Sequence, residues 1–187
     1  EKVTMETEIS GLNIVPATID LSSADIDLIS NEKRSHLLHA ALRKKQQDKQ
    51  KYDYILIDCP PSLNILTVNA MVASHSVLIP LQSEFFALEG LSQLLLTVKE
   101  VRQTANENLR VEGIVLTMFD GRNNLSKQVE ADARSNLREL VFKTIIPRNV
   151  RVSEAPSYSM PVLTYDPSSK GSKAYMSLAK ELLANNS

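Results

Sequence analysis

The chain has 187 residues, 43% hydrophobic and 23% charged, enough to bury the core of one globular domain. Its formal net charge of −1 excludes a uniformly basic nucleic-acid-binding or membrane-surface protein, so any basic surface must be local. The single cysteine, Cys59, excludes an internal disulfide, and no apolar run approaches the roughly 20 residues needed to cross a bilayer.

Short apolar runs and amphipathic helical patterns alternate along the chain. The apolar runs predict strands at residues 12–17, 52–58, 76–81, 111–119 and 141–147. The amphipathic patterns predict helices at residues 22–30, 35–50, 63–73, 87–105, 125–140 and 173–185, and residues 148–172 follow no regular pattern. Apolar strands separated by helices indicate a single α/β domain over residues 1–187, doubly wound around a mostly parallel sheet with helices on both faces.

The stretch KYDYILIDCPPSLN, residues 51–64, ends an apolar run on Asp58. In doubly wound sheets ligands bind beyond the carboxyl ends of the strands. A carboxylate at this end can hold Mg²⁺, directly or through water, beside nucleotide phosphates. The alternative is that Asp58 caps the following helix. Pro60 and Pro61 favour the metal site because they make the turn rigid, and we expect Cys59 to be a small buried residue.

Three arginines follow predicted strand ends, Arg122 in FDGRNNLS and both Arg148 and Arg151 in IPRNVRVSEAP. Parallel strands bring their carboxyl ends to one edge of the sheet, so we expect all three arginines on the same edge as Asp58. Guanidinium groups suit the phosphates of nucleotides and nucleic acids. A lone arginine is usually only solvated, but three at one edge favour a phosphate site.

No phosphate-binding glycine loop is present in the 187 residues. A Walker A loop requires G-x-x-x-x-G-K-[ST], and the dinucleotide fingerprint requires G-x-G-x-x-G. The five glycines, at positions 11, 90, 113, 121 and 171, match neither spacing. The chain also begins with Glu1 rather than methionine, so we expect it to start within a longer protein.

From about Val3 onward, the sequence resembles the ParA/Soj family of chromosome- and plasmid-partitioning ATPases, which have a deviant Walker A loop. The resemblance rests on YDYILIDCPPSLNILTVNAM, VLIPLQSEFFALEGLSQLL, GIVLTMFDGRNNLS, IPRNVRVSEAPS and PVLTYDPSSKGSKAYMSLAKELL. Family members have a strand, the Walker A loop and a second acidic strand ahead of the position of Glu1. The chain therefore resembles the C-terminal portion of such a protein, with an incomplete P-loop NTPase fold.

The resemblance implies ATP-dependent dimerisation and nonspecific DNA binding for chromosome or plasmid segregation. ATP and Mg²⁺ are the cofactors expected of the full-length family member. The implied partners are nucleoid DNA, a ParB-like centromere-binding protein and a second copy of the chain. Membrane binding is not expected. The implied location is cytoplasmic and nucleoid-associated. Because the phosphate cradle is missing, we expect no ATP turnover by the 187 residues alone.

The same resemblance implies roles for individual residues. Asp58 matches the Walker B aspartate, which organises magnesium through water and takes part in catalysis. Arg122 and Arg151 match the arginines that bind DNA. Four residues match the part of the family that lines the nucleotide pocket: Met118, Pro147, Arg148 and Asn149.

The chain departs from the family pattern at three places. Asn64 replaces a common glycine, GRNN replaces RTN, and SYSMP replaces SHGKP, which removes a glycine at 159 and a lysine at 160. One alternative function is a non-catalytic module that pairs with a full-length ParA or a ParB-like partner. Another is a MinD-like membrane ATPase, but this needs a basic, membrane-seeking C-terminal helix. Residues 173–187 carry an ordinary packing stripe and end polar.

Overall fold

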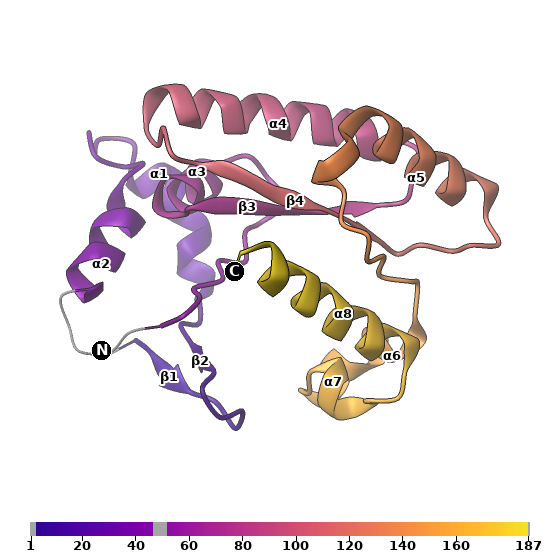
Figure 1. The fold of residues 1–187 in the computed structure, drawn as a ribbon. Helices are drawn as coiled ribbons and strands as arrows, with labels where there is room; N and C mark the ends of the chain where they lie inside the picture. Colours follow the sequence, from indigo (N-terminus) through magenta and orange to yellow (C-terminus); the bar gives the residue numbers. More distant parts are fainter. Residues whose placement is uncertain (1–2, 47–51, 187) are drawn as a thin grey trace. The chain divides into compact units, whose positions relative to one another are not determined.

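The computed structural model describes residues 3–46 and 52–186 of the chain, which divides into two compact units, Glu1–Ala73 and Ser74–Ser187 (Figure 1). The second unit contains a parallel pair of strands, β3 (Ser76–Gln82) and β4 (Arg110–Thr117). Helix α4 (Ala87–Thr104) joins them, as a parallel crossover requires.

Helices cover both faces of this parallel pair (Figure 1). On one face α4 and α5 (Asn124–Leu137) pack on the strands through a core that includes Leu91, Leu116 and Ala133. On the other face α8 (Lys170–Asn185) packs through Leu178. The structure confirms two predicted strands, at 76–81 and 111–119, and three predicted helices, at 87–105, 125–140 and 173–185. Their ends differ from the predicted ones by at most three residues. The last three residues of the second predicted helix form a short 3₁₀ helix, Arg138–Leu140.

A β-bulge at Glu112 ties the start of β4 to the end of α8. Val77 pairs with Val111 but Leu78 pairs with Gly113, so Glu112 is the extra residue. Its carboxylate accepts hydrogen bonds from the Arg110 guanidinium and from the Asn186 side chain. A β-carbon at residue 113 would overlap the ring of Phe142, so glycine is needed beside the bulge.

The predicted strand at 141–147 forms only two isolated bridges, one to β4 and one to the segment that follows β4, which corrects the prediction of a continuous strand. Parallel bridges join Ile114 to Val141 and Phe119 to Pro147. Between them the backbone amides of Lys143 and Thr144 point away from β4 and donate to the carboxylate of Glu181 on α8. The strand is interrupted because these two amides take a side-chain acceptor in place of the ladder.

Residues 148–172, predicted to be irregular, contain three short helices: α6 (Val150–Glu154), a 3₁₀ helix (Ala155–Tyr158) and α7 (Val162–Tyr165). Ser159 ends the 3₁₀ helix in the left-handed conformation, with φ 55° and ψ 31°. Such short helices have no repeating apolar pattern to reveal them, because they depend on caps and tertiary contacts.

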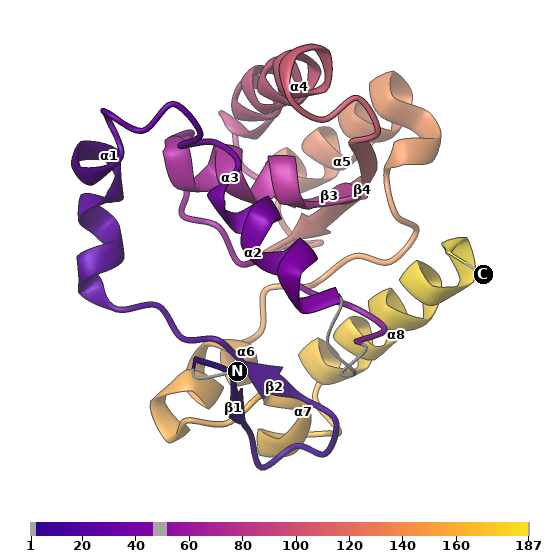
Figure 2. The ribbon, with the colours of Figure 1, turned by 90° about the vertical axis from the view of Figure 1, so that its left-hand side faces the viewer.

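In the first unit, α2 (Leu37–Gln46) packs against α3 (Ile65–Ala73) (Figure 2). The buried Asn69 side chain joins them, accepting from the backbone N–H of Leu38 and donating to the carbonyl of Arg34. These helices confirm the predictions at 35–50 and 63–73, although residues 47–50 lie outside the described residues.

Two other elements of the first unit are shorter in the structure than the sequence predicted. The helix predicted at 22–30 is a 3₁₀ helix (Ile19–Ser23) followed by α1 (Ala24–Asp27). The strand predicted at 12–17 is the two-residue β2 (Asn13–Ile14), which pairs antiparallel with β1 (Met5–Glu6). Exposed side chains in this segment leave little apolar burial to lengthen either element.

The strand predicted at 52–58 is wrong for this structure. The segment pairs with no strand among residues 3–46 and 52–186. Its apolar side chains Tyr54, Ile55 and Leu56 are 53%, 54% and 85% exposed. The pattern indicates a strand, but a strand exists only where a neighbour completes the backbone ladder.

Candidate functional site

Three chain segments lie side by side at the carboxyl end of the parallel strands of the second unit: those that follow β3 and β4, and residues 146–148. After β3, the Ser83 amide donates to the Thr117 carbonyl at 3.2 Å. After β4, the Phe119 amide donates to Ile146, and the Arg148 amide returns a bond to Phe119 at 2.9 Å. Loops at this carboxyl edge are the usual ligand position in an α/β sheet.

The residues matched to the nucleotide pocket lie along this edge. Met118 follows β4 in the left-handed conformation, with φ 54°, a strained state for a long side chain. The Phe119–Pro147 bridge places Met118 and Arg148 on adjacent segments. Asn149 caps α6, accepting a hydrogen bond from the Arg151 amide at 3.0 Å. The structure therefore brings all four to neighbouring segments of one unit.

Arg122 is held by an acid that the sequence pattern did not single out. Its Nε and Nη2 donate to Oδ1 and Oδ2 of Asp120 at 3.0 and 2.9 Å, and its backbone amide also donates to Oδ1. These contacts, led by the Arg122 side chain, lower the pKa of Asp120 to about 2. The guanidinium nevertheless remains open to solvent, because the Arg122 side chain is 92% exposed.

Arg148 adds a second pair of opposite charges to the same edge. Its Nη2 lies 3.8 Å from Oε1 of Glu84, which follows β3. Its positive charge also contributes to the low pKa of Asp120, after the larger effects of Arg122. Glu84, Arg148, Asp120 and Arg122 thus form a chain of alternating charges drawn from the three segments.

Arg151 is also paired with acids. Its Nη1 donates to Oε2 of Glu154 at 2.8 Å, and its Nε lies 3.4 Å from Oδ2 of Asp166. The Tyr165 hydroxyl donates to the same Glu154 oxygen, and the Tyr165 ring stacks on Tyr158 at 5.0 Å. The Glu154 hydrogen bond is the main cause that raises the pKa of Arg151, so this arginine stays charged.

Asp58 belongs to the first unit, Glu1–Ala73, where it is exposed and followed by Pro60 and Pro61. It does not cap α3. Oδ1 of Asn64 instead accepts from the amides of Leu66 and Thr67 at 3.1 and 3.3 Å. The alternative role for Asp58 as a helix cap is therefore wrong.

Cys59 is exposed, which corrects the expectation of a buried residue. Partial burial of its thiol, and then the Asp58 carboxylate, raise the pKa of Cys59. A raised pKa keeps the thiol protonated and argues against a nucleophilic role.

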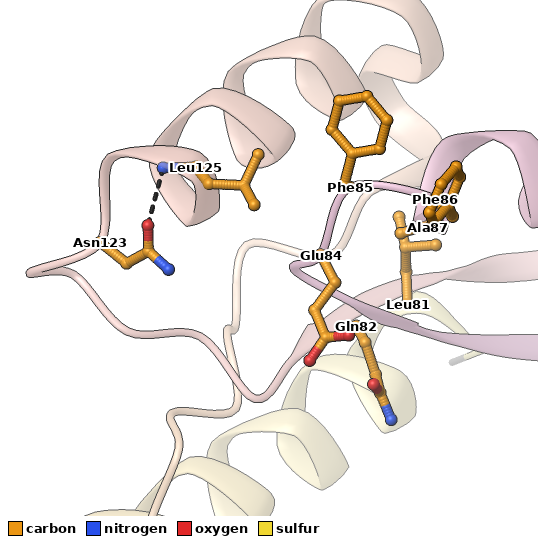
Figure 3. A pocket seen from close by; sticks show the side chains of 8 residues that line it. All are labelled: Leu81, Gln82, Glu84, Phe85, Phe86, Ala87, Asn123 and Leu125. Atoms are coloured by element: carbon orange, nitrogen blue, oxygen red, sulfur yellow. Dashed lines mark hydrogen bonds between the residues drawn. The ribbon is translucent and has the colours of Figure 1, made fainter.

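A pocket of about 600 Å³ opens between the loop after β3 and the start of α5 (Figure 3). Phe85 and Phe86 line it, each 72% exposed, with their rings edge to face at 5.0 Å. Figure 3 shows Glu84 and Gln82 on one side and Asn123, the cap of α5, on the other. None of the four residues matched to the nucleotide pocket lines it.

Within residues 3–46 and 52–186, no group of three or more His, Cys, Asp or Glu side chains could hold a metal ion. No described helix combines the length and the apolar character that a bilayer crossing would need.

Comparison with known proteins defines the class. A family model described as an AAA domain matches residues 1–111. The cobyrinic acid a,c-diamide synthase of Mycobacterium smegmatis, solved with bound ADP and magnesium, is 34% identical with a TM-score of 0.79. The match covers 97% of this chain and 65% of that one. A Borrelia burgdorferi plasmid partition protein, bound to AMPPNP, shares the fold at 21% identity with a TM-score of 0.80, covering 98% and 68%.

The chain therefore has an α/β P-loop NTPase-like fold with a parallel sheet covered by helices. The Bacillus subtilis sporulation initiation inhibitor protein Soj is 51% identical over 179 residues, covering 96% of this chain and 70% of the relative. The Caulobacter vibrioides chromosome partitioning protein ParA is also 51% identical, over 96% of this chain and 67% of the relative. The chain belongs to the ParA/Soj family of chromosome-partitioning ATPases. It spans about two thirds of the length of these proteins.

Proposed function

We propose that the chain serves chromosome or plasmid partitioning as a ParA-type ATPase, with residues 1–187 acting as one α/β domain. In this role ATP drives homodimerisation and the dimer binds nucleoid DNA without sequence preference. A ParB-like protein would be its partner, and its place would be the nucleoid in the cytoplasm. The observation that carries the proposal is the 51% identity, over 96% of the chain, to two partitioning proteins.

For the nucleotide, we assign magnesium to Asp58. Mg²⁺ usually keeps several waters and takes one or two carboxylates together with substrate phosphates. The exposed carboxylate of Asp58, two residues before Pro60, fits this donor set, whereas a metal caged entirely by protein would need more ligands than the described residues group together. Magnesium would neutralise phosphate charge, and Asp58 would orient the water that joins it to the protein.

The nucleotide base would contact the edge formed by Met118, Pro147, Arg148 and Asn149. Support comes from the backbone bonds that hold these segments together, since a base needs a rigid wall. A rigid wall is useful because it leaves less ordering to be done on binding.

DNA would bind to Arg122 and Arg151. Both guanidiniums are on exposed loops or short helices of the second unit, at 92% and 52% side-chain exposure. Phosphate contacts give affinity that is independent of sequence and falls with salt. A dimer would place two such small basic groups on one ligand, so a net charge of −1 does not oppose DNA binding.

The test compares DNA affinity of the chain and of Arg122→Ala and Arg151→Ala variants over a salt series, with and without Mg-ATP. Each substitution should weaken binding on every duplex and reduce the salt slope by about one unit. Arg102→Ala is the matched control, because Arg102 is exposed in the last turn of α4, at the opposite end of the parallel strands. Unchanged affinity and slope in both test variants would remove these arginines from the DNA surface.

The nucleotide part has its own test. We expect no ATP turnover by the 187 residues alone, because their glycines form no phosphate loop. Magnesium-dependent hydrolysis that disappears in Asp58→Ala would contradict this expectation. It would at the same time support the magnesium role of Asp58.

A further inference from the structure

The loop between β4 and α5 is electrically balanced rather than basic. Arg122, on this loop, lies against Asp120, and Arg148 pairs with Glu84 while its positive charge also acts on Asp120. The two positive and two negative side chains sum to zero formal charge. A phosphate approaching Arg122 therefore meets a guanidinium that already has a carboxylate partner.

The contact between Asp120 and Arg122 is double. Both carboxylate oxygens of Asp120 accept from the guanidinium, at 3.0 and 2.9 Å, in the forked geometry that also suits phosphate. Because the Nε and Nη2 donors serve Asp120, a phosphate that uses the same fork must replace the carboxylate.

We propose that Asp120 is an internal competitor for phosphate at Arg122 and so sets how tightly this loop holds a polyanion. The inference rests on the proposed DNA role of Arg122. In the free chain the carboxylate occupies the fork, and on binding a DNA phosphate takes its place. The released carboxylate then lies close to the phosphate and weakens the complex by repulsion.

Asp120 also shapes the loop: its Oδ1 serves both the backbone and the fork, whereas its Oδ2 serves the fork alone. Oδ1 accepts the Arg122 backbone amide, and the Asp120 carbonyl accepts the amide of Asn123, which caps α5. Asparagine keeps an oxygen for the backbone amide but replaces the second oxygen by an NH₂ donor. Asp120→Asn therefore preserves the turn while it removes the negative charge and one side of the fork.

The low pKa of Asp120, about 2, keeps the competitor charged at any pH at which DNA binding is measured. The salt dependence of DNA affinity should therefore be weaker in wild type than in a chain without this carboxylate. In the wild-type chain, the ion pair between Asp120 and Arg122 must break before a phosphate can occupy the Nε–Nη2 fork of Arg122. Without the carboxylate, Arg122 binds the phosphate as a full positive charge, so more DNA counterions are released and the affinity falls more steeply with salt.

The experiment measures binding of nonspecific duplex DNA to the chain, with and without Mg-ATP, by fluorescence anisotropy in increasing KCl. Asp120→Asn should bind about 3–10-fold more tightly at low salt, with a slope steeper by about one unit. Glu107→Gln changes the net charge equally, but Glu107 is exposed in the turn before β4, at the opposite end of that strand, so it should change affinity less than twofold. The increase in affinity should vanish when Asp120→Asn is combined with Arg122→Ala.

Two results separate the inference from the function on which it rests. If Arg122→Ala weakens binding but Asp120→Asn binds DNA no better than wild type, Asp120 is not a competitor and the DNA role stands. If Arg122→Ala leaves the affinity unchanged, the DNA role fails and the inference fails with it. NMR gives a readout without DNA: the Arg122 Nη2 protons, which lose their Oδ2 acceptor, should exchange with solvent faster in Asp120→Asn. Equal exchange in both chains would overturn the proposed fork.

Discussion

Glu181 and Thr144 are joined by a 2.9 Å hydrogen bond from the Thr144 backbone amide to Oε2 of the carboxylate. Oε1 accepts the neighbouring amide of Lys143, so one side chain of α8 satisfies both amides of the interrupted strand. Glu181→Ala should lower the free energy of unfolding by about 1–2 kcal/mol, because two amides lose a charged acceptor. Urea unfolding checks this, with Lys180→Ala, an exposed neighbour on α8, as a control expected within about 0.5 kcal/mol of wild type.

The Glu181 contribution should depend on pH. Burial tends to raise the pKa of Glu181, but hydrogen bonds from Thr144 and Lys143 outweigh it and the net pKa lies below 4.5. A carboxyl whose pKa is lower in the folded chain stabilises it fully above the unfolded value. This stabilisation disappears as the pH falls through the folded pKa. The stability difference between wild type and Glu181→Ala should therefore be constant near neutrality and shrink below pH 4.5; a difference that grows on acidification would contradict the role of the carboxylate.

Asn64 offers a test of helix capping in the first unit. Its side chain accepts from the amides of Leu66 and Thr67 at the start of α3. Asn64→Ala should destabilise α3 by about 1 kcal/mol, whereas Asn64→Gly should cost only a few tenths. Hydrogen exchange of the Leu66 and Thr67 amides reports the effect directly. Equal protection in Asn64→Ala and wild type would show that the cap does not hold the helix.

Replacing Ser159 by glycine should stabilise the folded chain. It adopts a left-handed conformation while its amide donates to the Pro156 carbonyl at 3.0 Å, and the next amide, of Met160, donates to Ala155. Residues other than glycine are strained in the left-handed conformation, so Ser159→Gly should raise the free energy of unfolding by about 0.5 kcal/mol.

Ser157→Gly provides the matched control for Ser159, because Ser157 lies inside the 3₁₀ helix. There glycine adds freedom to the unfolded chain without relieving strain, so stability should fall by about 0.5 kcal/mol. Thermal unfolding of the two variants should shift in opposite directions. A shift of the same sign in both would contradict the assignment of strain to Ser159.

Gly171 permits the close approach of α8 to α6. A β-carbon at residue 171 would overlap Cγ2 of Val152 and lie 3.3 Å from Oδ1 of Asn149. Gly171→Ala should therefore cost about 1–3 kcal/mol by overpacking. Gly90→Ala, in α4 with nothing within 4 Å, should instead stabilise by up to about 1 kcal/mol. Guanidinium unfolding distinguishes the two, and a stable Gly171→Ala would show that α6 can move aside.

The elements predicted well from the sequence are those whose own pattern decides their structure. Helix α4 and strands β3 and β4 have strong apolar patterns and form within a few residues of the predicted bounds. Residues 52–58 have an equally strong pattern, but a strand needs a partner that no local pattern encodes. The prediction for residues 141–147 was wrong in part because Glu181, about 40 positions away, takes the amides of the strand.

The candidate site was predicted in part. The rule that parallel strands end together predicted Arg122 and Arg148 at one edge, and the backbone bonds of the structure hold their segments side by side. Met118, which the family resemblance pointed to, lies on the same segment as Arg122. Their roles remain predictions. The acids that hold the arginines were missed. An aspartate two residues before Arg122 and a glutamate three residues after Arg151 were the available signals, whereas Glu84 and Asp166 come close only through the fold.

The unpaired segment 52–58 has a consequence for the behaviour of the chain in solution. Tyr54, Ile55 and Leu56 are exposed, and the segment that carries them pairs with no strand in the part of the chain that the structure describes. Such a run is a template on which another extended chain can add, and repeated addition produces fibres. The charge of Asp58 and the rigidity of Pro60 and Pro61 limit growth at one end, in the manner of gatekeeper residues.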